Sequence, residues 1–225
     1  MEFDDFVLTA ATDDLAAEPA AREHADAVEF RMDLATEPRP ALADYDGDLP
    51  LVVTNRADWE GGAAADGDDR LDALATASEH PRVAAVDVEL RSLVGESSGP
   101  DAGWVAEHAR DHGSRVIASV HDFETTPPAL DDLLTRAAEA GDVGKLAVTA
   151  ESRADTLALL SATHRATAAG HRVATMAMGD AGRHTRAVAP LYGSKIGYAP
   201  VDPADATAPG QYDLATLAEL VETLA

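Results

Sequence analysis

The sequence predicts a (β/α)8 barrel that spans residues 1–225 as a single domain. Short runs rich in Val, Ile and Leu alternate eight times with longer runs rich in Ala, Leu and Glu. The length of 225 residues is compatible with one such barrel. An open doubly wound sheet is the alternative fold, and the lack of a G-x-G-x-x-G motif after the first strand weakens it.

The expected elements follow from local patterning, with turn residues and glycines between the runs. The predicted strands are 6–10, 27–32, 51–55, 83–88, 115–120, 143–148, 172–176 and 194–198. Helices are expected over 71–78, 104–112, 129–140, 155–169 and 214–223, with Asp69, Asp101, Thr126 and Asp213 as candidate N-terminal caps. Three long polar or Gly/Pro-rich loops, 57–70, 91–101 and 199–211, follow strands at the end where barrel active sites are built.

Composition limits the possible partners and surroundings. Seventeen basic residues against 41 acidic ones give a formal charge of −24, which repels nucleic acid and anionic lipid. Because the acids are scattered and lysine is almost absent, we expect a surface adapted to a salt-rich cytoplasm; an ordinary acidic protein is the alternative. The chain has no cysteine, no apolar run long enough for a membrane span and no signal-like start, so we predict a cytoplasmic protein without disulfides.

Lysine use gives the first indication of chemistry. The chain has two lysines, and Lys145 lies inside the apolar run 143–148. A lysine in a buried strand is typical of a Schiff-base nucleophile, although an ion pair with Asp87 or Glu89 would also explain it. Lys195 shares a strand face with two glycines, and we expect it to be structural.

Strand alternation places other ionisable groups on the same kind of face as Lys145. In each of four strands one face is apolar, and the opposite face carries polar or charged residues near the C-terminal end. A barrel would direct these groups inward together. They are Glu29, Arg31 and Asp33, then Asp87 and Glu89, then Ser119 and His121, and finally Lys145.

His108 and His112 have the i, i+4 spacing with which a helix can hold a metal ion. The sequence shows no third ligand for them, so we expect exposed helix residues and no metal site.

The motifs occur in an order that resembles one family. Glu29-Phe30-Arg31-Met32-Asp33 is followed by Thr54-Asn55-Arg56 with Glu60-Gly61-Gly62, Asp87-Val88-Glu89, Ser119-Val120-His121-Asp122-Phe123, Lys145, Met178-Gly179, Arg186 and Ala208-Pro209-Gly210-Gln211. This set, which extends from the second strand to the last loop, resembles the type I 3-dehydroquinase family. The resemblance implies a barrel enzyme of the shikimate pathway that converts 3-dehydroquinate to 3-dehydroshikimate without a cofactor and forms a homodimer.

The resemblance also implies a role for each site residue. Lys145 would form an imine with the C3 ketone, His121 would remove the C2 proton and then help water leave, and Glu89 would orient the imidazole. Arg186 would bind the substrate carboxylate. Glu29, Arg31 and Arg56 would contact the ring hydroxyls. Met178, or alternatively Met176, would pack against the ring, and Thr207 and Gln211 on the last loop would close over the substrate.

The sequence departs from the family pattern at two positions, and two alternative functions remain open. Thr207 stands where the family usually has Ser, and Thr185 precedes Arg186 where the family usually has Ser, which leaves the fine affinity for substrate open. Another imine-forming barrel enzyme, an aldolase of small sugars, is one alternative, although Asp180 would repel a substrate phosphate. A non-catalytic barrel that binds small anions is the other, and it predicts loss of Lys145, His121 or Glu89, all of which are present.

Overall fold

The computed structural model describes residues 1–202 and 210–225. Over these ranges eight strands form one sheet in the order β7-β6-β5-β4-β3-β2-β1-β8. Every predicted strand is present, with ends displaced by at most two residues. The strands are β1 (Val7–Thr12), β2 (Ala27–Arg31), β3 (Leu51–Thr54), β4 (Val83–Glu89), β5 (Arg115–Asp122), β6 (Val143–Thr149), β7 (Val173–Met178) and β8 (Ile196–Pro200).

The sheet curls into a nearly closed barrel, which confirms the predicted fold class. Neighbouring strands from β1 to β7 pair in parallel, and β1 also pairs in parallel with β8. The gap between β7 and β8 is crossed by a single bridge, Val173 to Ser194. There the backbone N–H of Lys195 donates to the carbonyl of Val173 over 2.7 Å.

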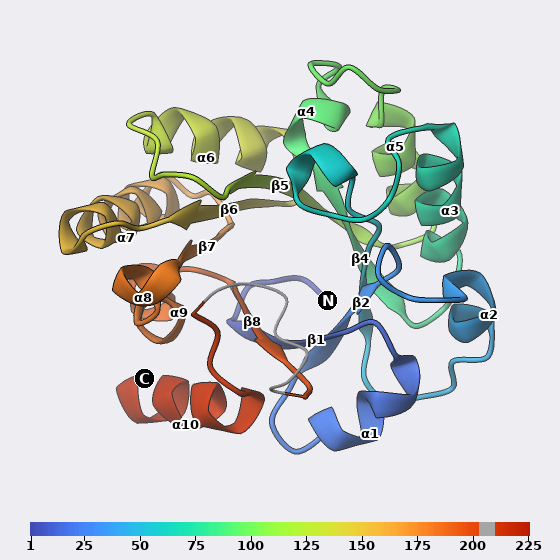
Figure 1. Ribbon diagram of the computed structural model, residues 1–225, viewed down its shortest axis with the longest axis horizontal. Coiled ribbons are helices and arrows are strands. Elements are labelled where there is room, and N and C mark those ends of the chain that lie inside the picture. Colours follow the sequence, from blue (N-terminus) through green and yellow to red (C-terminus); the bar gives the residue numbers. More distant parts are fainter. Residues whose placement is uncertain (203–209) are drawn as a thin grey trace.

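Helices surround the strands on the outside (Figure 1). The five longer ones match the predicted positions: α3 (Asp68–Ser78), α5 (Gly103–Asp111), α6 (Leu130–Ala140), α7 (Arg153–Ala168) and α10 (Leu214–Leu224). Shorter helical pieces, which the sequence analysis did not predict, complete the connections. They are α1 (Glu18–Ala21), α2 (Pro38–Ala43), α4 (Leu90–Leu93), α8 (Gly179–Gly182), α9 (Thr185–Val188) and the 3-10 turns η1 (Leu15–Ala17), η2 (Asp58–Glu60) and η3 (Ala189–Tyr192).

The N-terminal helix caps predicted from the sequence are only partly confirmed. Asp213 caps α10 as predicted, and Asp101 accepts a hydrogen bond from the backbone at the start of α5. The predictions for Asp69 and Thr126 were wrong. Asp69 lies within α3, which begins at Asp68, three residues before the expected start at 71, and the Thr126 hydroxyl donates to the carbonyl of Thr149.

The barrel interior is layered along the strands. At the amino-terminal end, Val52, Ile117 and Val143 form an apolar layer with neighbouring strands, and Phe3 packs against it. Because side chains alternate, the next inward position on each strand lies two residues further on. On β6 that position is Lys145. The polar residues therefore form a layer above a packed base, at the carboxyl ends of the strands. None of the helices described has the length and apolar content that a bilayer span requires.

Candidate active site

A cleft lies at the carboxyl ends of the strands and holds about 560 Å³ of space, part of it open to solvent. Predicted site residues that line it are Glu29, Arg31, Arg56, His121, Lys145, Met178, Arg186 and Gln211, together with Met176, the alternative to Met178. Glu89 is absent from the lining, and Thr207 lies outside the described residues. Residues that the sequence analysis did not assign to the site also line it: Thr54, Glu60, Gly61, Phe123, Ala147 and Tyr198.

Lys145 points from the middle of β6 into this cleft and is only 4% exposed. Its Nζ donates to Oδ2 of Asp87 over 2.8 Å and lies 3.8 Å from a carboxylate oxygen of Glu29. The Nζ also lies 4.2 Å from the ring centroid of Tyr198. Of the two ion pairs that the sequence offered for Lys145, the one with Asp87 forms. The amine nevertheless remains at the cleft, so the ion pair and a chemical role are compatible.

Asp87 is the counter-ion of this layer. Its other oxygen accepts a hydrogen bond of 2.8 Å from Nη2 of Arg56. Burial alone would raise the pKa of Asp87, but the positive charges of Arg56 and Lys145 outweigh burial, and the pKa falls below its usual value. Asp87 therefore stays ionised and holds both cations in place.

His121 is the penultimate residue of β5 and lies at the cleft, with its ring stacked on Phe123 at a centroid distance of 5.9 Å. Burial, together with the charges of Arg56 and Lys145, lowers the pKa of His121 well below its usual value. The imidazole is therefore neutral near pH 7 and available as a base.

The carboxylate beside His121 is Glu60, which corrects the prediction that Glu89 orients the ring. Nδ1 of His121 lies 2.9 Å from Oε1 of Glu60. Glu89 is fully buried, and it accepts hydrogen bonds from the backbone N–H of Ala57 and from Nη1 of Arg70, at 2.9 and 2.8 Å. Because these donors occupy Glu89, it fixes the loop after β3 rather than the imidazole.

Glu60 reaches the cleft because η2 turns the loop after β3 back over the barrel. Burial, reinforced by the charges of Glu89 and Asp87 and opposed by Arg56, raises the pKa of Glu60 to about 8. The sequence carried one signal for this contact: Glu60 follows Arg56 by four residues, next to two glycines. The motif contains these residues, but it does not show the path of the loop in space.

Arg56 serves the protein's own carboxylates. Its Nη1 donates to the hydroxyl of Ser119 over 2.5 Å, and its Nη2 holds Asp87. We predicted that Arg56 reads substrate hydroxyls. It does line the cleft, but its described contacts are those of an internal cation.

Arg186 differs from the other buried cations of the site. It is 4% exposed, and its Nε and Nη2 have no hydrogen-bond partner among the described residues. Burial lowers the pKa of Arg186 to about 10, and the guanidinium remains charged at neutral pH. A buried guanidinium whose N–H groups are unused at a cleft is built to receive an anion.

The remaining predicted residues line different parts of the cleft. Glu29 accepts a hydrogen bond of 2.8 Å from Thr54, and Arg31 forms a two-bonded pair with Asp33 at 2.9 and 2.6 Å. Met178 is 2% exposed and supplies apolar lining. Lys195 lies apart from the cleft, where its Nζ donates to the carbonyl of Asp4, as expected for a structural residue.

Comparisons with known proteins identify the family of the chain. The family model for type I 3-dehydroquinase matches residues 7–225. The chain belongs to the type I 3-dehydroquinase family. It is 62% identical to the 3-dehydroquinate dehydratase of Haloarcula marismortui, over 100% of this chain and 98% of that protein. It is 58% identical to the 3-dehydroquinate dehydratase of Halobacterium salinarum, over 100% of both chains. Both relatives come from halophilic archaea.

Solved structures of dehydroquinases share the barrel. A 3-dehydroquinate dehydratase from Geobacillus kaustophilus superposes with a TM-score of 0.82 at 24% identity, over 98% of this chain and 91% of that one. A type I 3-dehydroquinate dehydratase from Clostridium difficile, solved with covalent modified comenic acid, gives a TM-score of 0.81 at 25% identity, over 98% and 92%.

Proposed function

We propose that this member of the dehydroquinase family dehydrates 3-dehydroquinate to 3-dehydroshikimate through an imine on Lys145. Family membership supplies the overall reaction. The imine is supported by one observation above others: the cleft lined by the buried amine of Lys145 is also lined by Arg186, whose Nε and Nη2 have no hydrogen-bond partner in the part of the chain that the structure describes. A small carboxylate with a ketone would fit both groups at once.

Substrate binding starts at Arg186 in this scheme. Its guanidinium accepts the carboxylate as a charge-assisted pair, which the cleft walls shield from water. Glu29 and Arg31 contact the ring hydroxyls, and Met178 packs against the ring. We propose that Gln211, which lines the cleft, contacts the bound ring.

Imine formation then activates the carbon next to the ketone. The ammonium of Lys145 first gives a proton to neutral His121; the resulting amine attacks C3, and the ketone oxygen leaves as water after further proton transfers through His121. The iminium withdraws electrons, so the C2–H becomes acidic. His121, which is neutral because its pKa is lowered, removes the C2 proton and gives an enamine.

Elimination completes the chemistry. The enamine electrons form the C1–C2 double bond, the C1–O bond breaks, and protonated His121 gives its proton to the departing hydroxyl. Water then hydrolyses the iminium, releasing 3-dehydroshikimate and free Lys145. No oxidant is needed, because imine formation releases one water, imine hydrolysis consumes one, and the net change is the loss of one water from C1 and C2.

The two carboxylates near the base have separate duties in this proposal. Glu60 touches His121 and is its partner during both proton transfers. Glu89, predicted from the sequence as a catalytic residue, acts instead as a positioning residue through Ala57 and Arg70. The covalent modified comenic acid in the Clostridium difficile relative's structure shows that a relative's structure holds a covalent adduct, which supports covalent chemistry here.

The test is trapping of the imine in concentrated potassium chloride. Borohydride added with 3-dehydroquinate should leave a stable adduct that peptide mass spectrometry maps to Lys145. The chain offers a matched control, because its second lysine, Lys195, lies outside the cleft. Lys195→Ala should keep the adduct and the activity, whereas Lys145→Ala should lose both. Folded protein that gives neither an adduct nor the enone absorbance of the product would exclude the proposal.

Two wider predictions accompany this function. We propose a homodimer that works in the cytoplasm. Light scattering at high salt tests the first part, and a mass equal to one chain of 23.4 kDa would contradict it.

A further inference from the structure

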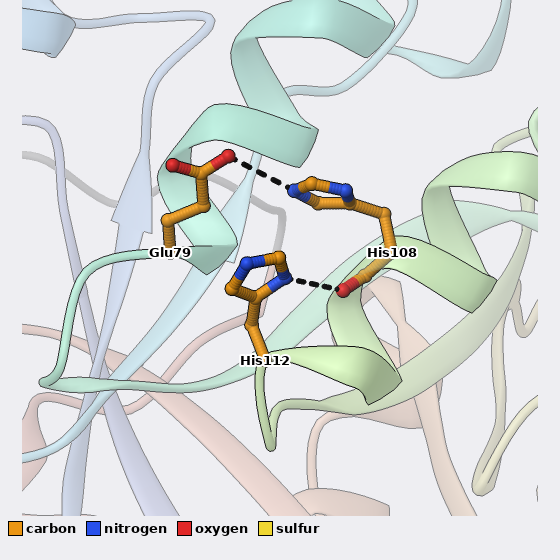
Figure 2. Close-up of side chains that lie close together, drawn as sticks. All are labelled: Glu79, His108 and His112. Atoms are coloured by element: carbon orange, nitrogen blue, oxygen red, sulfur yellow. Dashed lines mark hydrogen bonds and ion pairs between the residues drawn. The ribbon is translucent and has the colours of Figure 1, made fainter.

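Three metal-ligating side chains meet outside the cleft, between two helices of the outer ring. Glu79 directly follows the last residue of α3, His108 lies in the last turn of α5, and His112 directly follows α5. Each offers one ligand atom, and all three atoms lie within 4.8 Å of one another. Figure 2 shows the two rings and the carboxylate turned toward one another. The sequence showed only the histidine pair, because Glu79 lies 29 residues before His108.

The hydrogen bonds around the cluster prepare it for a cation. Nδ1 of His112 lies 2.8 Å from the backbone carbonyl of His108, to which it can only donate. This bond fixes the tautomer and leaves a lone pair on Nε2 of His112. Nε2 of His108 lies 3.0 Å from Oε1 of Glu79. A histidine that donates one ring N–H to a carbonyl and presents the other nitrogen is the usual arrangement in metal sites.

We propose that Glu79, His108 and His112 form a zinc site that joins α3 to α5. Two imidazoles and one carboxylate are a donor set that suits Zn²⁺, and water would fill the fourth tetrahedral position. Bond lengths of about 2.0–2.1 Å require the donor atoms to approach to roughly 3.3 Å. The present spread of 4.8 Å closes by rotation of side chains that are exposed or half-buried.

The chemistry of the donors decides which cation the site takes. A chain with charge −24 attracts every cation, and its scattered carboxylates suit Mg²⁺ and Ca²⁺. Imidazole nitrogen instead favours Zn²⁺ and related transition metals. Zinc at this cluster should therefore bind as one equivalent, distinct from weak cation binding over the acidic surface.

The site stabilises the fold and has no part in dehydration. None of the three ligands lines the cleft, and the two helices pack through a shared apolar core that includes Leu74 and Val105. A cation that binds the folded chain and not the unfolded one raises stability by mass action. At a zinc concentration about 100 times Kd, we expect the unfolding midpoint to rise by roughly 5–10 °C.

The experiment uses the full chain, freed of metal with a chelator and returned to concentrated potassium chloride. Titration with ZnCl2 is followed by calorimetry and by thermal unfolding, and titration with CoCl2 by the visible absorption of tetrahedral cobalt. We expect one strong equivalent of either metal and a higher midpoint, with unchanged dehydration of 3-dehydroquinate. Magnesium at the same concentration should give neither effect.

Variants separate this site from general surface binding. His108→Gln, His112→Gln and Glu79→Gln should each weaken zinc binding at least tenfold and abolish the shift in midpoint. His164→Gln is the matched control, because His164 is also exposed on a helix but belongs to α7, away from the cluster. Absence of a strong equivalent in the native chain overturns the proposal. So does zinc binding that the three variants leave intact, or binding that magnesium reproduces.

Discussion

Glu60, from the loop after β3, lies 2.9 Å from Nδ1 of His121 at the end of β5. The contact joins a carboxyl group whose pKa is raised to about 8 and an imidazole whose pKa is lowered, both mainly by burial. Near pH 7 the carboxyl group of Glu60 is therefore protonated, whereas the imidazole of His121 is neutral. As the pH rises through about 8, Glu60 becomes an anion that accepts the Nδ1 hydrogen bond and strengthens His121 as a base.

This pair predicts a specific change in the pH dependence of catalysis. In the native enzyme kcat/KM should rise as the pH passes about 8, because Glu60 loses its proton there. Glu60→Gln removes the titrating group, so the rise near pH 8 should disappear and activity should fall by about 10²–10⁴-fold at high pH. Steady-state rates across the pH range in constant salt give the answer. An inflection that survives in the glutamine variant would belong to another residue.

Arg186 predicts opposite effects on activity and stability. Arg186→Gln should lower kcat/KM by about 10–150-fold. This factor corresponds to the loss of about 1.5–3 kcal/mol, the usual contribution of a hydrogen bond to a charged group. The fold should not suffer, because Nε and Nη2 have no partner to lose among the described residues. Arg186→Met should therefore leave the free energy of unfolding unchanged or raised.

The control for Arg186 lies three residues earlier. Arg183 is exposed, and its guanidinium lies 4.1 Å from the ring centroid of Tyr212. Arg183→Gln should change kcat/KM by less than about threefold, since no buried charge is removed. Steady-state kinetics and urea denaturation are measured for the Arg186 variants and for Arg183→Gln. A large loss of stability in Arg186→Met would mean that the guanidinium supports the fold.

Replacing Asp87, unlike replacing Arg186, should lower the stability of the fold, because Asp87 pairs with two buried cations. Asp87→Asn leaves Lys145 and Arg56 without their shared counter-ion, and we expect a loss of about 3–5 kcal/mol in the free energy of unfolding. Asp131→Asn is the comparison: its pair with Arg165 is exposed on both sides, and its loss should change the free energy of unfolding far less. Urea denaturation followed by circular dichroism at fixed salt measures both. Equal losses would show that the buried pair contributes no more than the exposed one.

The sequence predicted the barrel well because its signals are local. Alternation along β6 places Lys145 inward from the residues of that strand alone, and the same is true of His121 on β5. The contact between His121 and Glu60 depends instead on how a loop folds over the barrel. The same holds for Glu89, whose partner Arg70 becomes buried only when α3 packs in place.

Gly144 tests whether the position of Lys145 depends on the packing of its strand against a helix. Gly144 precedes Lys145 on β6, and a Cβ there would lie 2.6 Å from the backbone nitrogen of Ala138 in α6. Since backbone cannot move aside as a side chain can, Gly144→Ala should separate β6 from α6. We expect a loss of about 1–3 kcal/mol in the free energy of unfolding and at least a tenfold lower kcat.

Gly67 provides the control for this substitution. A Cβ at Gly67 meets nothing within 4 Å and its backbone is extended, but Gly67 is the N-cap of α3, where Ala is less favourable than Gly; Gly67→Ala should therefore change kcat little and lower stability by at most about 1 kcal/mol. Urea denaturation and kcat are measured for both variants. If Gly144→Ala loses stability but keeps kcat, α6 has moved while β6 has stayed. The base layer of the barrel would then hold Lys145 in place without the helix behind it.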